Sequence, residues 1–304
     1  MKKLNAKTVK KYLFIGSILL YPALLFLVLY VFVNINSIAL AFQQITDLSG
    51  TREFVGFDNF VTFFEGLKGN SFFLHCAGNS LKMYAINLVV CIPLYILFSF
   101  YIFKRHFASK AIRIIVMVPA IVSVFIVSMV FSKFVEGSLP SLMKKLGFGQ
   151  IGSLLKDPNY SFGTTIFYMI WVSFSTALVL FPNAMTSIDN EVIESAKIDG
   201  VNELQELWYI VLPLIYPTLS TFLITGVAGI FINQGPLIAF YMYDAPYEVY
   251  NIGYYMYVEV LRDQATAVYR YAEVATSGVI VTLISVPVTL AVKYLLEKYG
   301  PATE

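Results

Sequence analysis

Six long apolar stretches constrain this chain more than any other feature of its sequence. Each holds about 20 mostly apolar residues, the length that an α-helix needs to cross the hydrocarbon core of a bilayer. A backbone in lipid must satisfy its own hydrogen bonds, so helices are expected. None of the stretches shows the ten-residue alternation of a transmembrane β-strand. They are Tyr12–Val33, Met83–Phe103, Ile114–Ser132, Thr164–Ala184, Ile210–Ile232 and Val274–Val292.

Composition leads to the same fold class. Of the 304 residues, 58% are hydrophobic and only 13% are charged, against about 25% charged residues in soluble domains. A water-exposed surface built from this chain would carry apolar patches larger than soluble monomers tolerate. We therefore predict an all-α integral membrane protein with six transmembrane helices. The same composition excludes a disordered chain, a secreted disulfide scaffold and a nucleic-acid binder.

The distribution of lysine and arginine predicts the orientation in the membrane. Cytoplasmic connections carry an excess of these residues, and two segments are rich in them, which places both termini inside. The apolar run of the first stretch is too long for a signal peptide, so we expect a retained helix. The two segments contain Lys2, Lys3, Lys7, Lys10 and Lys11, and Lys104, Arg105, Lys110 and Arg113.

Three parts of the chain follow from these spans. Residues 1–70 are predicted to hold the N-terminal cytoplasmic tail, the first transmembrane helix and an outer loop. Residues 71–292 form a five-helix transmembrane core, and residues 293–304 form a cytoplasmic tail. The loop between the fourth and fifth spans, 187–209, is predicted to face the cytoplasm.

The cysteines and a group of tyrosines are candidates for a metal site and a binding surface. Cys76 and Cys91 form no metal-ligand pattern, so we expect buried or lipid-facing thiols and no metal site. Seven tyrosines crowd the segment from Tyr241 to Tyr257. They are typical of an interfacial aromatic belt, and a docking or sugar-stacking surface is the alternative.

The acidic segment Asn190–Pro213 differs from the rest of the chain. Its pattern predicts two helices: Asp189 or Asn190 can cap the first, and Gly200 suits the left-handed residue that ends it. Asn202, followed by Gln205 three residues later, predicts a capping box at the start of the second helix. A bilayer-surface helix is disfavoured because the cytoplasmic leaflet is negative.

In this segment the sequence resembles the permease subunits of binding-protein-dependent bacterial ABC importers. Their loop signature is E-A-A-x-x-x-G, followed after nine residues by I-x-L-P. The matching residues, with Ser195 in place of the first alanine, are Glu194-Ser195-Ala196, Gly200 and Ile210-Val211-Leu212-Pro213. Features similar to the carbohydrate-uptake (MalF-like) branch are Ile198-Asp199-Gly200, Gly56-Phe57-Asp58-Asn59-Phe60, Asn79-Ser80 and Pro119.

This resemblance implies the type I ABC importer permease fold in a bacterial cytoplasmic membrane. It implies three kinds of partner: a dimer of ATPase subunits, a second permease of different sequence and an extracytoplasmic sugar-binding protein. ATP and Mg²⁺ are expected on the ATPase, because this chain lacks a GxxxxGK[ST] phosphate-binding loop. The chain itself is expected to hold no cofactor and no catalytic residue. The predicted coupling residues are Glu194, Ser195, Ala196, Asp199, Gly200, Ile210, Leu212 and Pro213.

Polar and aromatic side chains inside or beside the spans are candidates for a substrate pathway. A neutral sugar is bound by polar groups that match its hydroxyls and by aromatic rings. Hydrogen bonding between helices explains such side chains equally well. The candidates are Asn87, Trp171, Ser175, Asn233 and Gln234.

Three other functional classes remain as alternatives. A gradient-driven secondary transporter is disfavoured because no predicted span has an interior charge. An intramembrane enzyme or scaffold is disfavoured because the spans contain no Ser–Lys, HExxH or paired-Asp arrangement. An ABC importer for another class of solute, such as a lipid, an amino acid or a phosphodiester, is not separated from a sugar importer by the residues alone.

Overall fold

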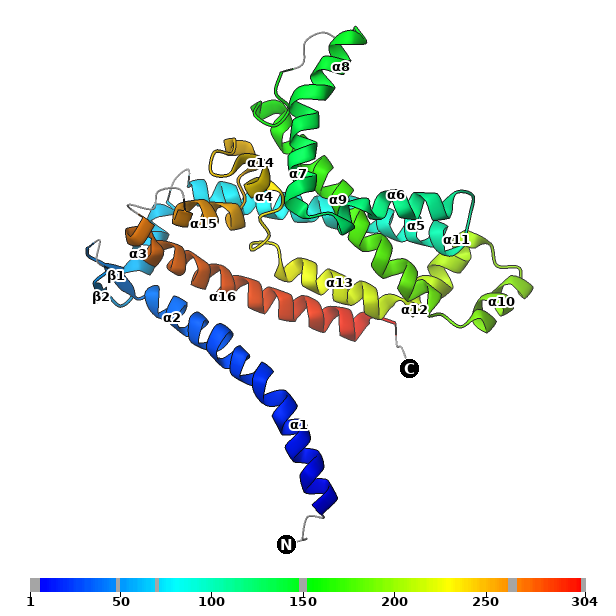
Figure 1. Cartoon of the computed structure of the whole chain (residues 1–304), viewed down its shortest axis with the longest axis horizontal. Helices are drawn as coiled ribbons and strands as arrows, with labels where there is room; N and C mark the ends of the chain where they lie inside the picture. Colours follow the sequence, from blue (N-terminus) through cyan, green and yellow to red (C-terminus); the bar gives the residue numbers. More distant parts are fainter. Residues whose placement is uncertain (1–5, 48–49, 69–70, 148–151, 262–266, 302–304) are drawn as a thin grey trace. The chain divides into compact units, whose positions relative to one another are not determined.

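Two compact units divide the chain. The first consists of Met1–Lys68 and Arg262–Ile280, and the second of Gly69–Leu261 and Val281–Glu304. The computed structural model (Figure 1) describes residues 6–47, 50–68, 71–147, 152–261 and 267–301. Within these ranges the protein is mostly helical, and its last helix, α16 (Ala267–Tyr299), contributes residues to both units.

A single long helix begins the first unit. It consists of α1 (Ala6–Leu25), a π-helical stretch over Phe26–Phe32 and α2 (Val33–Leu40). From Lys10 to Leu40 it is long and apolar enough to cross a membrane, and the protein buries none of the side chains in its most apolar window. Such a surface is suited to lipid. The expectation of a first spanning helix is confirmed.

A small lobe follows this helix. Strand β1 (Gln43–Ile45) pairs with antiparallel β2 (Arg52–Phe54), and α3 (Asp58–Gly66) comes next. The Asn59 side-chain amide donates hydrogen bonds of 2.9 Å to the carbonyls of Ala41 and Gln43. Asn59 therefore connects α3 to the end of the long helix. This contact gives a structural role to the asparagine of the Gly-Phe-Asp-Asn-Phe pattern.

Helices α5 and α9 form the core of the second unit. α4 (Phe72–Ile86) continues through a π-helical turn over Asn87–Cys91 into α5 (Ile92–Phe103), and α9 extends over Pro158–Thr186. α5 and α6 (Ser109–Ile121) both pack along α9 (Figure 1). Tyr95 of α5 is fully buried against Phe174 of α9, with the rings edge to face and 4.8 Å apart.

The third span differs from its prediction. One continuous helix was expected from Ile114 to Ser132, but α6 (Ser109–Ile121) ends and α7 (Val124–Lys133) begins within that stretch. Pro119 removes a backbone donor from the last turn of α6. Val122 and Ser123 then adopt extended ψ angles of 147° and 132°. The candidate span in this region is instead Val124–Lys145, which includes α8 (Leu139–Lys145).

The fifth span is bent. α11 (Glu203–Glu206), a π-helical turn and α12 (Leu212–Leu214) meet α13 (Tyr216–Ala228) at an angle of 71°. Pro213 and Pro217 flank the bend, and neither can donate the intrahelical hydrogen bond. The chain therefore has five apolar helices of spanning length among its described residues, or six if the bent pair is one span.

The tyrosine-rich segment is only partly buried: three of its seven tyrosines lie in the core, and the other four are half-buried or exposed. α14 (Leu237–Tyr241) and α15 (Ile252–Leu261) enclose it. Tyr241, Tyr250 and Tyr254 are buried in one hydrophobic cluster. The Tyr241 hydroxyl donates to the Leu155 carbonyl at 2.8 Å, and burial raises the pKa of Tyr241 to about 12. Tyrosine content alone could not distinguish a belt from a core. Tyr247 has 47% of its surface exposed, and Tyr243, Tyr255 and Tyr257 are half-buried, so these four residues leave the belt and the docking surface as alternatives.

Both cysteines are buried free thiols. In the described part of the chain, no group of three His, Cys, Asp or Glu residues has a geometry that could hold a metal ion. The expectation of buried thiols is confirmed.

Candidate functional sites: the α9–α13 connection and a polar cavity

Helix α10 (Asn190–Ile198) begins with a side-chain cap. The Asp189 carboxylate accepts a hydrogen bond of 3.2 Å from the backbone N–H of Glu191. This interaction satisfies one of the free donors at the helix start and places a negative charge at the positive end of the dipole. Of the two predicted caps, the structure selects Asp189 over Asn190.

The end of α10 is fixed by Gly200. Its φ angle is +77°, a left-handed conformation that glycine adopts without a Cβ clash. The Val201 N–H donates to the Ala196 carbonyl at 3.1 Å, and the Gly200 N–H donates to the Lys197 carbonyl at 3.2 Å. These two bonds form a Schellman motif, which satisfies carbonyls that the helix end would leave free. The predicted role of Gly200 in ending this helix is confirmed.

A capping box starts α11 only three residues later. The Asn202 side chain accepts from the Gln205 N–H at 2.9 Å, and the Asn202 N–H donates to the Gln205 side chain at 3.0 Å. The predicted pair is confirmed. The chain reverses between two fixed helix ends, and Figure 1 shows α10 lying beyond the ends of α9 and α12. We call residues 187–215 the α9–α13 connection.

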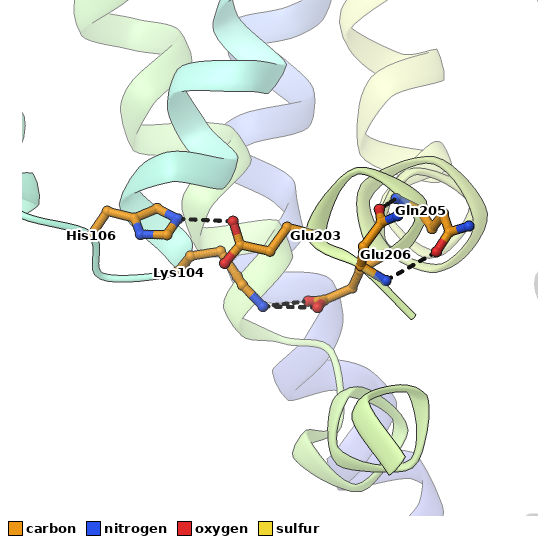
Figure 2. Close-up of polar contacts among 6 residues, drawn as sticks. Lys104, His106, Glu203, Gln205 and Glu206 are labelled. Carbon is orange, nitrogen blue, oxygen red and sulfur yellow. Dashed lines mark hydrogen bonds and ion pairs between the residues drawn. The ribbon is translucent and has the colours of Figure 1, made fainter. Parts of the chain in front are cut away.

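One ion pair and one histidine–carboxylate contact connect this segment to the turn after α5, as Figure 2 shows. Lys104 Nζ lies 2.8 and 3.0 Å from the two carboxylate oxygens of Glu206. The side chains of Lys104 and Glu206 are only 12% and 2% exposed. His106 Nε2 lies 3.2 Å from a carboxylate oxygen of Glu203, and this second pair is largely solvent-accessible. Neither pair was predicted, because the partners are about a hundred residues apart.

The surface of α10 carries an open groove of about 450 Å³. Ser195 and Asp199 are exposed at its edge, whereas Ala196 is buried and Ile210 is half-buried. Glu194 and Gly200 are exposed but do not line the groove, and Leu212 and Pro213 are half-buried in the following helix. The predicted coupling residues thus lie on one contiguous connection. The groove is lined by Glu191, Val192, Ser195, Ala196, Asp199, Val201 and Ile210.

A cavity of about 290 Å³ with a mixed polar and apolar lining, called the polar cavity below for its amide and hydroxyl groups, lies among the helices of the second unit. None of the described residues that line it carries a charge, and its apolar lining residues are Met83, Ile92, Met169, Leu223 and Ile230. A Cβ at Gly226 would lie 3.1 Å from the Tyr84 ring, so the missing side chain lets this ring pack closely against α13. The polar or aromatic lining residues are Ser80, Tyr84, Asn87, Ser173, Phe222, Thr225, Asn233 and Asn251.

The predicted pathway residues do not all lie in this cavity. Asn87 and Asn233 line it. Trp171 is 39% exposed and contacts Phe131 and Tyr168. Ser175 is fully buried and donates to the Val172 carbonyl in its own helix at 2.7 Å. Gln234 is half-buried and is not part of the lining.

Hydrogen bonds close one side of the cavity. The Asn79 amide donates to the carbonyls of Glu248 and Tyr250 at 2.8 and 3.0 Å. Ser80 Oγ accepts from the Ile252 N–H at 3.0 Å, and the Asn251 amide donates to the Asn233 carbonyl at 3.0 Å. The family resemblance indicates Asn79 and Ser80. It does not indicate Asn251, because a single asparagine in a loop has no sequence pattern that predicts its contacts.

Residues 96–301 match the family of inner membrane components of binding-protein-dependent transport systems. The match covers more than half of the chain, and the chain belongs to this family. It is 28% identical to the protein LplB of Bacillus subtilis over 72% of this chain and 69% of LplB. It is 27% identical to the B. subtilis polygalacturonan/rhamnogalacturonan transport system permease protein YteP, over 73% of this chain and 70% of YteP.

A solved structure has the same fold. It is a chain of a bacterial ABC transporter involved in the import of the acidic polysaccharide alginate. The two chains share 22% of their residues, with a TM-score of 0.79 over 96% of this chain and 98% of the other. The protein therefore has the type I ABC importer permease fold. It is a multi-pass membrane permease component of an ABC transporter and not an enzyme.

Proposed function

We propose that this chain imports a sugar or oligosaccharide as one permease of a binding-protein-dependent ABC importer. The observation that carries the proposal is the uncharged polar cavity. Sugar hydroxyls need paired donors and acceptors, which Asn87 and Asn233 supply, and an apolar sugar face can stack on Tyr84 or Phe222. A lipid tail would leave these amides unsatisfied, and an amino acid would need charged partners. The polysaccharide named for YteP supports the same class of substrate.

The α9–α13 connection supplies the proposed contact with the ATPase. In this account α10 sits in a cleft of an ATPase subunit, which binds ATP and Mg²⁺, and Glu194, Ser195, Ala196, Asp199 and Gly200 form the contact. The geometry of the connection supports this contact. Side chains cap the starts of α10 and α11, and the Lys104–Glu206 ion pair connects α11 to the end of α5.

The proposed assembly contains three further features. A second permease of different sequence completes the pathway, and an extracytoplasmic binding protein delivers the sugar. Both termini and the α9–α13 connection lie on the cytoplasmic side of a bacterial cytoplasmic membrane. The lysines at the N-terminus and the basic turn after α5 support this orientation.

Cavity variants test the proposed substrate site. The sugar is first identified by a thermal-shift screen of the binding protein encoded with this permease, and its uptake is then measured in proteoliposomes. We expect Asn87→Leu and Asn233→Leu each to raise the KM for uptake about three- to tenfold, because each removes a hydrogen bond worth about 0.5–1.5 kcal/mol.

Ser220→Ala is the matched control. Ser220 lies in α13 and donates within that helix to Pro217, outside the cavity lining. Its KM should stay within about twofold of wild type. Wild-type KM values in both leucine variants would contradict a sugar site in this cavity.

A further inference from the structure

We propose that Lys104 and Glu206 are positioning residues that transmit motion of the α9–α13 connection to the helix that lines the cavity. This inference rests on the proposed function. It adds a mechanical link inside this chain, between the contact with the ATPase and the passage. The link is a buried ion pair whose partners are 102 positions apart.

Because the pair is buried, its hydrogen bonds fix the position of one side chain relative to the other, which we call a directional contact. Both oxygens of Glu206 face Lys104 Nζ, at 2.8 and 3.0 Å, and almost no water reaches the carboxylate. An unpaired charge at such a position is strongly unfavourable, so neither side chain can move away without the other. The pair therefore holds α11 at the C-terminal end of α5 as either element moves.

The backbone of the turn after α5 is shaped for this contact. Arg105 and Ala108 have φ angles of +55° and +57°, which are unfavourable for residues with a Cβ. Such conformations persist where surrounding interactions determine them, and they are frequent in switch regions. Here the Tyr101 hydroxyl donates to the Phe107 carbonyl at 2.8 Å, and the Ser109 N–H donates to the His106 carbonyl at 3.1 Å. The turn is a defined anchor for Lys104.

The other end of the same helix reaches the cavity. α4, the π-helical turn and α5 are continuous from Phe72 to Phe103, and Lys104 follows directly. Asn87 on this helix lines the cavity, about 25 Å from Lys104 at 1.5 Å per residue. A pull on Lys104 thus acts on the helix that carries Asn87. α9, which leads into the connection, packs along α5 and supports the same path.

The ratio of sugar transported to ATP hydrolysed, measured in the reconstituted importer, tests this link. We expect Glu206→Gln and Lys104→Met each to lower the ratio about tenfold. Loss of a hydrogen bond to a charged group changes an equilibrium constant by about tenfold or more. The double variant Lys104→Met with Glu206→Met leaves no unpaired charge and should assemble normally. It should still show the lowered ratio, since the directional contact is gone.

Two variants separate positioning from a purely structural role. Lys104→Arg keeps the charge and its hydrogen bonds and should restore the wild-type ratio. His106→Gln removes the exposed contact with Glu203 and the ring contact with Tyr101, keeps the Lys104–Glu206 pair, and should stay within about twofold of wild type. A role in stability alone would lower the yield of complex and leave the ratio unchanged. A wild-type ratio in the assembled double variant would overturn the link, whereas wild-type importer without any ATP-driven sugar uptake would overturn the proposed function.

Discussion

Gly200 shows how one residue sets the geometry of the candidate contact with the ATPase. Its left-handed backbone allows the Schellman motif that ends α10, and open space surrounds the position where a Cβ would lie. A substitution there is therefore strained through its backbone and not through a clash. We expect Gly200→Ala to destabilise the end of α10 by about 1 kcal/mol.

Hydrogen–deuterium exchange of α10 in the assembled complex measures this effect. Amides at the end of α10 should exchange about fivefold faster in Gly200→Ala, since 1 kcal/mol corresponds to that factor. Gly163→Ala is the control, because Gly163 has equally open surroundings and lies within α9, where its φ is not positive. It should leave α10 unchanged. Equal exchange in the two variants would show that the Gly200 conformation does not stabilise α10.

Residues whose partners are close in sequence were predictable. Asp189 bonds two residues ahead, and Asn202 and Gln205 bond to each other, so composition and spacing determine these caps. The Lys104–Glu206 pair was not predictable, because its partners meet only when α5 and α11 pack. The sequence showed Lys104 as part of a basic turn and Glu206 as part of an acidic segment, but not their contact.

At the scale of elements, hydropathy predicted the helices and missed their breaks. The prediction of one continuous helix from Ile114 to Ser132 is wrong, because Val122 and Ser123 adopt extended conformations. Hydropathy does not reveal this break, since both residues are as apolar or as small as their neighbours. The bend near Ile215 lies between two prolines, which hydropathy does not register. Tyr241, Tyr250 and Tyr254 are buried by long-range packing, which the tyrosine content of the segment does not reveal.

Asn79 connects α4 to the segment before α15. It is 2% exposed, and its amide donates to the Glu248 and Tyr250 carbonyls. We expect Asn79→Leu to lower the free energy of unfolding by about 2–4 kcal/mol, because two buried carbonyls lose their partner. The midpoint of thermal unfolding in detergent should fall.

Asn159→Leu is the comparison for this variant. The Asn159 side chain is exposed and bonds only to nearby Asp157 in the described contacts. Its midpoint should change little. An equal midpoint for Asn79→Leu and wild type would contradict a stabilising role for these bonds.

At the scale of the whole molecule, the fold and the family agree with the composition that excluded a soluble protein. The described residues that line the cavity carry no charge, and six of the 19 acidic residues lie on the α9–α13 connection. This arrangement fits a chain whose energy source is on another subunit.

Uptake by proteoliposomes that contain the assembled importer tests the central claim most directly. Labelled sugar, loaded on the binding protein, is offered outside vesicles with or without ATP and Mg²⁺ inside. The account predicts accumulation only with internal ATP and external binding protein, and no accumulation from an imposed proton or sodium gradient alone. Gradient-driven accumulation without ATP, or uptake that does not need the binding protein, would contradict it.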